Sequence, residues 1–517
     1  METWLLILIT ITICFVLKPI LTHHFTQKLD ASLPPGPFII PIIGSFLMLI
    51  RNSLADLEPI LRNLHAKYGS IVTLHVGPRP AIFIRDRSLT YQALIQNGAI
   101  FADRPPALPT FKIITSNQHN ISSAFYGSTW RQLRRNLTSE ILRPSRVMLY
   151  SYSRKWVLEI LFKRLQAHST TSSQLVCVKY HFQYAMFCLL CLMCFGDKLD
   201  EKQIKSIETV QRSILLAFGR FNVVNIFPRL TKLVFPKRWE KLWKVRRDQE
   251  QVLIPLINAR KTKKMSMQSK DDDQNDESPV SYADTLLELE LPLENRKLKE
   301  DEIVSLCSEF LNAGTDTTST SFEWTMANIV KYRHVQERLF EEIKAVVGDG
   351  AEDIKEEDLQ RMPYLKAVIL EGLRRHPPGH FVLPHAVTED VVLGGYFTPK
   401  NCSLNFMVAE MGLDSEVWED PTSFKPERFL KEDGSVETFD MACSKEIKMM
   451  PFGVGRRMCP GYGLAMLHLE YFVANLIWKF KWTADDELGV DLVSEKLEFT
   501  MVMKNPLHAR ISPRFIN

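Results

Sequence analysis

The hydrophobic positions of this chain begin with one long run at its N-terminus. Trp4 to Leu21 is almost wholly apolar, with Lys18 and Pro19 as the interruption near its end. That length is about sufficient for a short membrane-spanning helix. The pattern therefore predicts an N-terminal membrane anchor within residues 1–29.

A cleaved signal peptide is the alternative interpretation of this run. Signal peptides start with positive charge and end in small residues at the cleavage site. Here the second residue is Glu2, and bulky residues persist to the end of the run, which favours an uncleaved anchor. Lys18 and Lys28 follow the apolar core, and cations on that side predict that it faces the cytosol.

Prolines gather directly after the anchor, within Leu33–Pro37 and at Pro41. Proline bars a segment from helix and stiffens it. We therefore interpret residues 30–45 as a proline-rich hinge, which is compatible with an ordinary linker. No clean Pro/Gly/Ser linker divides the remainder, so residues 46–517 are predicted to form one large domain.

Shorter patterns predict individual elements in this domain. Strand-like runs at Val72–Val76 and Ala81–Ile84, joined by Gly and Pro residues, predict a β-hairpin. Residues 101–125 are polar, and we expect them to be irregular. Helices are predicted from Ser128 to Asn136 and, with an acid-rich first turn, from Lys299 to Lys331.

Residues 260–282 have the composition of a flexible loop. A basic block from Arg260 to Lys264 precedes an acidic block at 271–277, and Pro279 follows. Such dense charge with few apolar residues predicts a solvated, flexible loop between helices.

Composition narrows the class of protein. The chain has 517 residues, a net charge of +4 and a pI near 8.4, and it carries no basic low-complexity arm. This mild charge indicates no nucleic-acid partner. The 9 cysteines are odd in number and scattered, which fits a reducing compartment better than a disulfide scaffold.

Three of these cysteines, Cys188, Cys191 and Cys194, have the spacing C-x-x-C-x-x-C, which also occurs in iron–sulfur proteins. The surrounding run from Tyr184 to Phe195 is apolar and helix-forming, and a buried Cys behaves as a small hydrophobic residue. We therefore favour a core helix over a cluster site.

Cys459 lies in a different setting, the Gly- and Arg-rich loop Pro451–Gly461, which precedes an apolar, helix-forming run. A thiolate needs electropositive neighbours to stay ionised. We expect Arg456 and Arg457 to supply charge, and the start of the following helix to supply N–H groups and its dipole. Phe452 is expected to pack beside the sulfur and exclude water.

The glycines of this loop, Gly455 and Gly461, allow the backbone to turn tightly and to approach a large flat group closely. No second Cys or His lies within metal-cage spacing of Cys459, which argues against a zinc site. A single protein thiolate, with the remaining coordination from elsewhere, suits haem iron. The loop therefore predicts a haem-thiolate site, with an ordinary free thiol as the weaker alternative.

The long helix predicted from Lys299 carries the motif Ala313–Thr318 in its middle. Gly and clustered Thr are poor choices inside a helix, so we expect a local distortion there. An acid beside an alcohol can relay protons. We expect Thr317 to hold an oxygen species with its waters, and Asp316 to connect it to solvent.

The fixed positions of the cysteine loop, Phe452, Gly455, Arg457, Cys459 and Gly461, resemble the haem-binding signature of the cytochromes P450. The resemblance implies haem b, with Cys459 as the axial ligand of its iron and Phe452, Arg457 and Gly461 in contact with the cofactor. It also implies a mainly α-helical P450 fold with a smaller β-rich lobe and an N-terminal transmembrane anchor helix.

Other motifs follow in the order that this family has. The acid–alcohol motif resembles its oxygen-activation motif, with Asp316 and Thr317 as the catalytic residues. Trp130 and Arg134, at i and i+4 on one helix face, resemble the pair that hydrogen-bonds a haem propionate. His385 falls where the family places an Arg or His near a propionate.

Glu371, Arg374 and Arg428 match the Glu-x-x-Arg and Pro-Glu-Arg-Phe elements of the family, whose role is structural. A buried carboxylate between two arginines can hold chain segments in fixed register. Three further segments look like the plant 89A family in particular: residues 101–106, 116–120 and 376–385.

The resemblance implies a plant microsomal monooxygenase that inserts one oxygen atom of O2 into a hydrophobic small molecule. Electrons would come from NADPH through NADPH–cytochrome P450 reductase. The protein would be held in the endoplasmic reticulum membrane by a single pass, with its catalytic domain in the cytosol. Residues 378–382 and 499–502 match pocket-lining segments and are largely apolar. Candidate substrates are a linear tetrapyrrole from chlorophyll breakdown, a terpenoid and a fatty acyl compound.

Two other functions stay open. One is a P450 that rearranges an oxidised substrate without oxygen, as an isomerase or dehydratase, and the intact acid–alcohol pair argues against it. The other is a non-catalytic haem-binding sensor, which would have no use for apolar pocket segments. Arg131 and Arg135 fall on a different helix face from Arg134, and they are either a basic patch for an acidic reductase or plain surface charge.

Overall fold

The computed structural model divides the chain into two units, one of residues 1–105 with 383–407 and the other of residues 106–382 with 408–517. The predicted anchor, residues 1–29, and residues 38–45 of the predicted hinge lie outside the described residues. The structure describes residues 32–37, 57–76, 79–169, 175–220, 222–225, 228–268, 279–291, 293–400, 402–437, 439–485 and 489–515.

The smaller unit is built on a four-stranded sheet with the strand order β1-β2-β9-β6. β1 and β2 are antiparallel, with Ile71 opposite Ile84, so the predicted hairpin is confirmed. β9 is parallel to β2 and antiparallel to β6. The elements of this unit are α3 (Leu57–Tyr68), β1 (Ile71–Val76), β2 (Arg79–Ile84), α4 (Arg87–Tyr91), η2 (Gln92–Gln96), η3 (Ile100–Ala102), β6 (His385–Ala386), β7 (Val391–Leu393), β8 (Tyr396–Thr398) and β9 (Ser403–Phe406).

The described part of the predicted hinge, residues 32–37, is neither helix nor strand and runs along this sheet. The Thr73 N–H donates to the carbonyl oxygen of Pro35 over 2.9 Å. A Cβ on Gly36 would lie 2.0 Å from the carbonyl oxygen of Thr73. Only glycine fits so close an approach to the strand.

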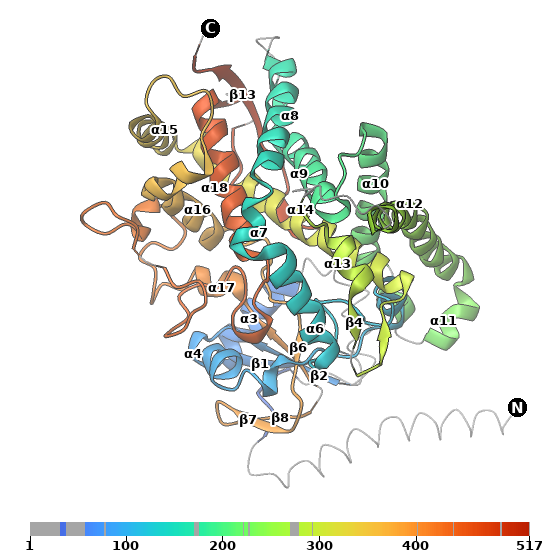
Figure 1. The fold of residues 1–517 in the computed structure, drawn as a ribbon. Helices are drawn as coiled ribbons and strands as arrows, with labels where there is room; N and C mark the ends of the chain where they lie inside the picture. Colours follow the sequence, from blue (N-terminus) through green and yellow to red (C-terminus); the bar gives the residue numbers. More distant parts are fainter. Residues whose placement is uncertain are drawn as a thin grey trace, which may run out of the picture. The chain divides into compact units, whose positions relative to one another are not determined.

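The larger unit is mainly helical (Figure 1). Its first elements are α5 (Pro109–Ile114), α6 (Ser128–Leu137), η4 (Thr138–Leu142), α7 (Pro144–Met148), α8 (Ser151–Ser169), β3 (Val176–Cys177), α9 (Val178–Phe195), α10 (Glu201–Arg220), η5 (Asn222–Asn225), α11 (Pro228–Val234), α12 (Pro236–Gln268), α13 (Tyr282–Glu288), β4 (Glu290–Leu291) and β5 (Arg296–Lys297). They are followed by α14 (Glu300–Lys331), α15 (Arg333–Val347), η6 (Glu356–Arg361), α16 (Pro363–Arg375), α17 (Val408–Gly412), η7 (Pro426–Phe429), η8 (Gly455–Arg457), α18 (Tyr462–Lys479), β10 (Phe480–Ala484), β11 (Glu495–Leu497), β12 (Met501–Met503) and β13 (His508–Pro513).

Helix α14 is the central element of this unit. It begins after Lys299 and ends at Lys331, as the sequence predicts, and its first turn holds acidic residues at the positive end of the helix dipole. Every residue from Thr318 to Val330 is buried. The helix packs against α9, α16 and α18, and Figure 1 shows it beside α9.

Through its Gly and Thr motif, α14 stays α-helical, so the predicted distortion is wrong. The Thr317 hydroxyl donates to the carbonyl oxygen of Ala313 over 2.6 Å, which satisfies it within the helix. Gly314 serves packing instead. A Cβ there would lie 2.7 Å from Cδ1 of Leu190 on α9, so the glycine allows the two helices to approach closely.

Helix α9 carries Cys188, Cys191 and Cys194, and all three are buried and free. The predicted core helix is thus confirmed against a cluster site. Burial raises the pKa of the Cys188 thiol to about 11. Among the described residues, α9 is the one helix long and apolar enough to cross a membrane, but 72% of it is buried inside the protein.

The predicted loop at 260–282 is wrong in its first part, because α12 continues to Gln268. Lys and Arg are good helix formers, and here they also find partners. Arg260 binds Asp284 on α13 through two contacts of 2.9 and 2.6 Å, and Lys263 binds Asp197 over 2.9 Å. Residues 269–278 lie outside the described chain.

Residues 101–125, expected to be irregular, contain a short helix. Helix α5 starts at Pro109, where the fixed φ of proline suits a first helical turn. The remainder up to α6 holds turns without a regular element. The prediction of an irregular segment is therefore wrong at α5 and at the last two residues of η3, Phe101 and Ala102.

We predict that Cys191→Ser lowers the free energy of unfolding by about 1–3 kcal/mol, because a polar hydroxyl would replace the thiol in an apolar core. The thermal midpoint of the haem-loaded protein measures the effect. Cys191→Ala is the control for lost volume and should cost less. Equal midpoints for Cys191→Ser and the unaltered protein would contradict the burial of this side chain.

Candidate functional site

The loop that presents Cys459 lies between η8 and α18. The Cys459 N–H donates to the carbonyl oxygen of Phe452 over 2.9 Å, which closes the loop. Gly453 and Gly455 have φ values of 65° and 72°, a region that glycine enters without strain. Gly461 has an ordinary φ of −94° as the first residue before α18, so its expected role in a tight turn is not needed.

The charge around Cys459 differs from the sequence prediction. Burial raises the pKa of the Cys459 thiol, while the Gly461 N–H and the Arg134 guanidinium lower it. Arg134 reaches this loop from α6 and donates to the carbonyl oxygen of Met458 over 2.7 Å. The net shift is upward, so the chain by itself favours the thiol, and a bound metal ion would be needed to ionise it.

The two arginines of the loop itself point elsewhere, which corrects the expectation that they supply the charge. Arg456 donates to the Tyr126 hydroxyl over 2.7 Å. Arg457 donates to the backbone carbonyl oxygens of Ala124, over 2.7 Å, and Ile121, over 3.3 Å. Arg456 and Arg457 are therefore close to Cys459 in the sequence, but their guanidinium groups bind other partners.

Trp130 is buried on α6 beside the same backbone. Its indole N–H donates to the carbonyl oxygen of Ile121 over 3.1 Å, and the Arg457 guanidinium lies over its ring at 4.3 Å. Arg134 also lies near the Trp130 ring, at 5.6 Å. The structure thus brings Trp130 and Arg134, the predicted propionate pair, together with Arg457, a predicted cofactor contact, beside the cysteine loop.

His385, the third predicted propionate contact, belongs to the smaller unit. It is buried on β6, and its Nδ1 makes a 2.7 Å hydrogen bond with the carbonyl oxygen of Phe101. Arg104 donates to the carbonyl oxygens of Leu383 and Pro384 over 2.8 and 2.9 Å and fixes the turn before it. The sequence pattern did not predict this role of Arg104, although the segment 101–106 is one of those that resemble the plant 89A family.

Asp316 and Thr317 lie on α14 with different surroundings. Ala313 is exposed and Thr317 half-exposed, although the helix around them is buried. We call this pair of positions, one helical turn apart, the accessible strip. Asp316 is buried beside it and accepts a 3.1 Å hydrogen bond from Gln183 of α9.

Burial raises the pKa of Asp316, and the nearby Arg212 acts against that rise. Arg212, on α10, lies 3.8 Å from Asp316 and also pairs with Glu498. Sequence reasoning missed Arg212, because nothing near it in the chain marks it as a partner of a residue on another helix.

Glu371, Arg374 and Arg428 come together as the sequence suggested. Arg374 binds Glu371 through two contacts of 2.6 and 2.8 Å, and Arg428 lies 3.3 Å from the same carboxylate. The Arg374 guanidinium also donates to the carbonyl oxygens of Gly412 and Pro421, over 2.6 and 2.9 Å. Glu371 and Arg374 are fully buried.

The residues present fit a haem group. Cys459 offers one half-buried sulfur with an N–H donor and a cation beside it. A Cβ built on Gly461 would meet nothing within 4 Å, so the backbone leaves open space beside the sulfur. Among the described residues, no group of three His, Cys, Asp or Glu side chains could hold a metal ion, and a single thiolate is the donor set that haem uses.

Comparison with known proteins decides the family. The family model described as Cytochrome P450 matches residues 34–511. The chain belongs to the cytochrome P450 family. It is 51% identical to Cytochrome P450 89A9 of Arabidopsis thaliana, over 97% of this chain and 99% of that protein. This relative confirms the resemblance to the plant 89A family.

Other P450 proteins are more distant. The chain is 31% identical to 5-epiaristolochene 1,3-dihydroxylase of Nicotiana tabacum, over 93% of each chain, and 28% identical to isoflavone 2'-hydroxylase of Medicago truncatula, over 95% and 94%. A solved structure of a zebra fish cytochrome P450 with abiraterone has a TM-score of 0.71 at 22% identity, covering 89% of this chain and 100% of that one. The predicted P450 fold is thereby confirmed.

P450 membership makes this chain a haem-dependent monooxygenase of hydrophobic substrates, with electrons from a redox partner. Haem iron held by one thiolate is the redox centre that this family implies. The described residues that could hold and serve that group are those assembled above around Cys459 and on the accessible strip.

We predict that Glu371→Gln lowers the free energy of unfolding by about 3–5 kcal/mol, because it leaves two buried or half-buried arginines without their carboxylate. The thermal midpoint and the fraction of protein that retains haem report the loss. Glu427→Gln is the matched control. Its partner Arg338, at 2.7 Å, is exposed, so the change should cost less than about 1 kcal/mol. Similar losses in the two variants would contradict the buried pairing.

Proposed function

We propose that this P450 inserts one atom of O2 into a hydrophobic small molecule, with electrons from NADPH delivered by NADPH–cytochrome P450 reductase. The observation that carries the proposal is the accessible strip of α14, with the acid Asp316 buried beside the alcohol Thr317. Haem b bound through Cys459 would supply the redox-active iron. Side chains of this protein would deliver protons and hold the cofactor.

Asp316 and Thr317 are proposed to deliver protons. The Thr317 hydroxyl keeps acceptor capacity beyond its bond to Ala313, and it lies on the accessible strip. Burial raises the pKa of Asp316, which brings the carboxyl closer to the range where it can both take and give a proton. Arg212 is 38% exposed and touches Asp316, which supports a connection to solvent.

The remaining predicted contacts are proposed to hold the cofactor. Cys459 would bind the iron, and Phe452 and Gly461 would lie against the ring. Trp130, Arg134 and His385 would bind the propionates, and Arg457 would contact the cofactor. Trp130 has one N–H, already donated to Ile121, so it would have to exchange that bond. Arg457 has five N–H donors and could keep its present bonds.

The reductase contact is proposed at the exposed face of α6. Arg131 and Arg135 are exposed there, which supports a basic patch for an acidic partner. The protein is proposed to be anchored once in the endoplasmic reticulum membrane by residues 1–29, with the catalytic domain in the cytosol. The apolar run Trp4–Leu21 supports this topology.

The substrate is proposed to be a linear tetrapyrrole from chlorophyll breakdown, a terpenoid or a fatty acyl compound. Support for the chemistry comes from relatives that are named as hydroxylases. An isomerase or dehydratase that needs no oxygen, and a non-catalytic sensor, remain as the alternatives. Dependence of product on NADPH and O2 separates these three functions.

We predict that Thr317→Ala lowers the amount of product formed per NADPH consumed by about tenfold or more, since a positioned proton donor contributes roughly a hundredfold to such steps. NADPH consumption and product are measured in the same reaction.

Thr317→Ser is the matched control, because it keeps the hydroxyl and should keep most of the coupling. A Thr317→Ala protein with unchanged coupling would remove Thr317 from the proton path.

The test of the whole proposal uses microsomes that contain this protein and a plant reductase. A plant tissue extract is supplied under isotopically heavy O2, with and without NADPH. We expect a product that gains one heavy oxygen atom only when NADPH is present. A product formed without either reagent, from protein with an intact thiolate spectrum, would instead favour the isomerase function.

A further inference from the structure

The segment between α5 and α6 contains a strained run of backbone. Ser116, Asn117 and Gln118 have φ values of 46°, 60° and 68°. None is glycine, and each such residue costs free energy relative to an ordinary turn. Three in succession persist only when the surroundings hold the chain there. The contacts of the next residues show what holds it.

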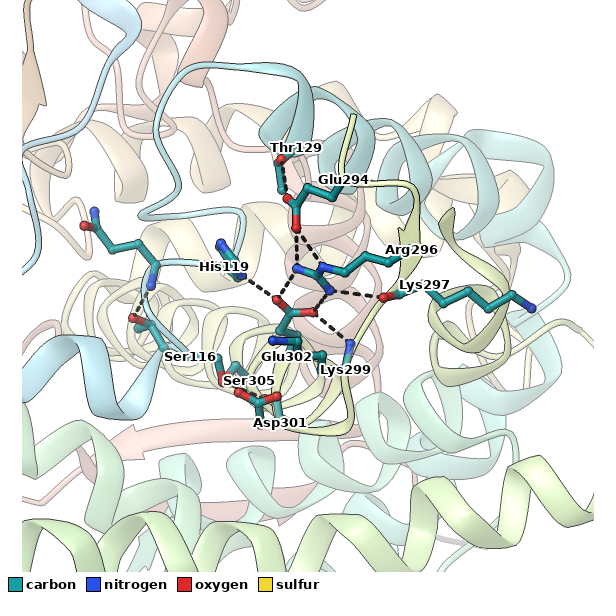
Figure 2. Close-up of polar contacts among 12 residues, drawn as sticks. Ser116, His119, Thr129, Glu294, Arg296, Lys297, Lys299, Asp301, Glu302 and Ser305 are labelled. Carbon is teal, nitrogen blue, oxygen red and sulfur yellow. Dashed lines mark hydrogen bonds and ion pairs between the residues drawn. The ribbon is translucent and has the colours of Figure 1, made fainter. Parts of the chain in front are cut away.

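His119 follows this run and binds the carboxylate of Glu302 in the first turn of α14 (Figure 2). Glu302 is itself fixed by Arg296, through contacts of 2.7 and 2.8 Å, and by the Lys299 N–H at 2.8 Å. Glu294 completes the cluster by binding Arg296 over 2.7 Å. We call His119, Glu302, Arg296 and Glu294 the His119 cluster.

A second carboxylate of α14 holds the residues that come after His119. Glu309 accepts hydrogen bonds from the Asn120 side chain over 3.0 Å, from the Ile121 N–H over 2.8 Å and from the Ser122 N–H over 2.7 Å. His119 and the Glu309 contacts therefore fix the segment to α14 two helical turns apart. Ser116 adds hydrogen bonds to the Asp301 carbonyl oxygen and to the Ser305 hydroxyl of the same helix, both over 2.8 Å. The Ile121 and Ser122 amides report directly on whether it stays there.

The same segment supplies the acceptors for side chains beside the cysteine loop. The Ile121 carbonyl oxygen accepts from Trp130 and from Arg457, and the Ala124 carbonyl oxygen accepts from Arg457. Movement of residues 116–124 away from α14 would thus release the Trp130 and Arg457 side chains from these carbonyl oxygens.

We propose that protonated His119 is a positioning residue. Its bond to Glu302 holds residues 116–124 against α14 and, through the carbonyls of Ile121 and Ala124, fixes Trp130 and Arg457 beside the Cys459 loop. The strained run precedes His119 directly, and Arg296 and the Lys299 N–H hold Glu302 in place.

The charges around His119 set the direction of its pH response. The hydrogen bond that His119 donates to Glu302 raises the pKa of His119 above its ordinary 6.5, burial lowers it, Glu294 raises it further and Arg296 lowers it. Burial alone would raise the pKa of Glu302, but bonds from His119 and Arg296 hold it well below its ordinary value. Glu302 is therefore a carboxylate over the pH range in which His119 titrates.

The sign follows from the raised pKa. The contribution of His119 is fully present below pH 6.5 and is lost as the pH rises through its higher folded-state pKa. At low pH His119 adds to the hold that Glu309 gives the segment, and at high pH that addition is lost.

Hydrogen exchange of the Ile121 and Ser122 amides tests the proposal in the haem-loaded protein, with rates corrected for the intrinsic effect of pH. We expect their protection to fall about tenfold between roughly pH 6 and pH 9, since a hydrogen bond to a charged group is worth about a factor of ten or more in an opening equilibrium. His119→Gln should show the low protection at every pH. His508→Gln is the matched control, since His508 bonds only a nearby backbone oxygen among the contacts described for it.

A second readout follows the thiolate. The reduced carbon-monoxide spectrum of His119→Gln should lose its thiolate form faster than that of the unaltered protein at low pH, and equally fast at high pH. Protection in His119→Gln that equals the unaltered protein at low pH, or that keeps the same pH dependence, would overturn the proposal. Equal loss of protection in His508→Gln would also overturn it.

Discussion

The structure depends on one electrostatic constraint, the ionisation of a half-buried thiol. Burial raises the pKa of Cys459, and the Gly461 N–H with Arg134 offsets this only in part. The chain therefore builds a site that favours the thiolate only together with a bound cation. A bound cation and the thiolate would stabilise each other, and other contacts hold in place the loop that presents the sulfur.

Buried polar and charged side chains provide these contacts inside the otherwise apolar core of the larger unit. Glu371 and Arg374 are fully buried, and the guanidinium also binds two backbone carbonyls. A pair of this kind adds little net stability but penalises any arrangement that separates it. It thereby fixes α16 against the segment from Gly412 to Pro421, which precedes the cysteine loop in the chain.

Helix α14 has three parts with different roles along its length. Its first turns hold Glu302 and Glu309, which fix the segment before α6. Its middle opens at Ala313 and Thr317 beside the buried Asp316. Its last turns, residues 318–330, are buried in the hydrophobic core. One straight helix can serve all three because the Gly314 contact lets α9 approach without breaking the helical hydrogen bonds.

The sequence by itself determined the chemistry that depends on neighbours in the chain. The cysteine loop, the acid–alcohol pair and the long helix from Lys299 to Lys331 follow from local pattern, because spacing along a helix or loop sets which residues share a face. Only the tertiary structure decided which charges meet. Arg134 rather than Arg456 acts on Cys459, and His119 finds Glu302 across 183 positions of sequence. Such pairs depend on the packing of distant helices, and no local periodicity encodes that packing.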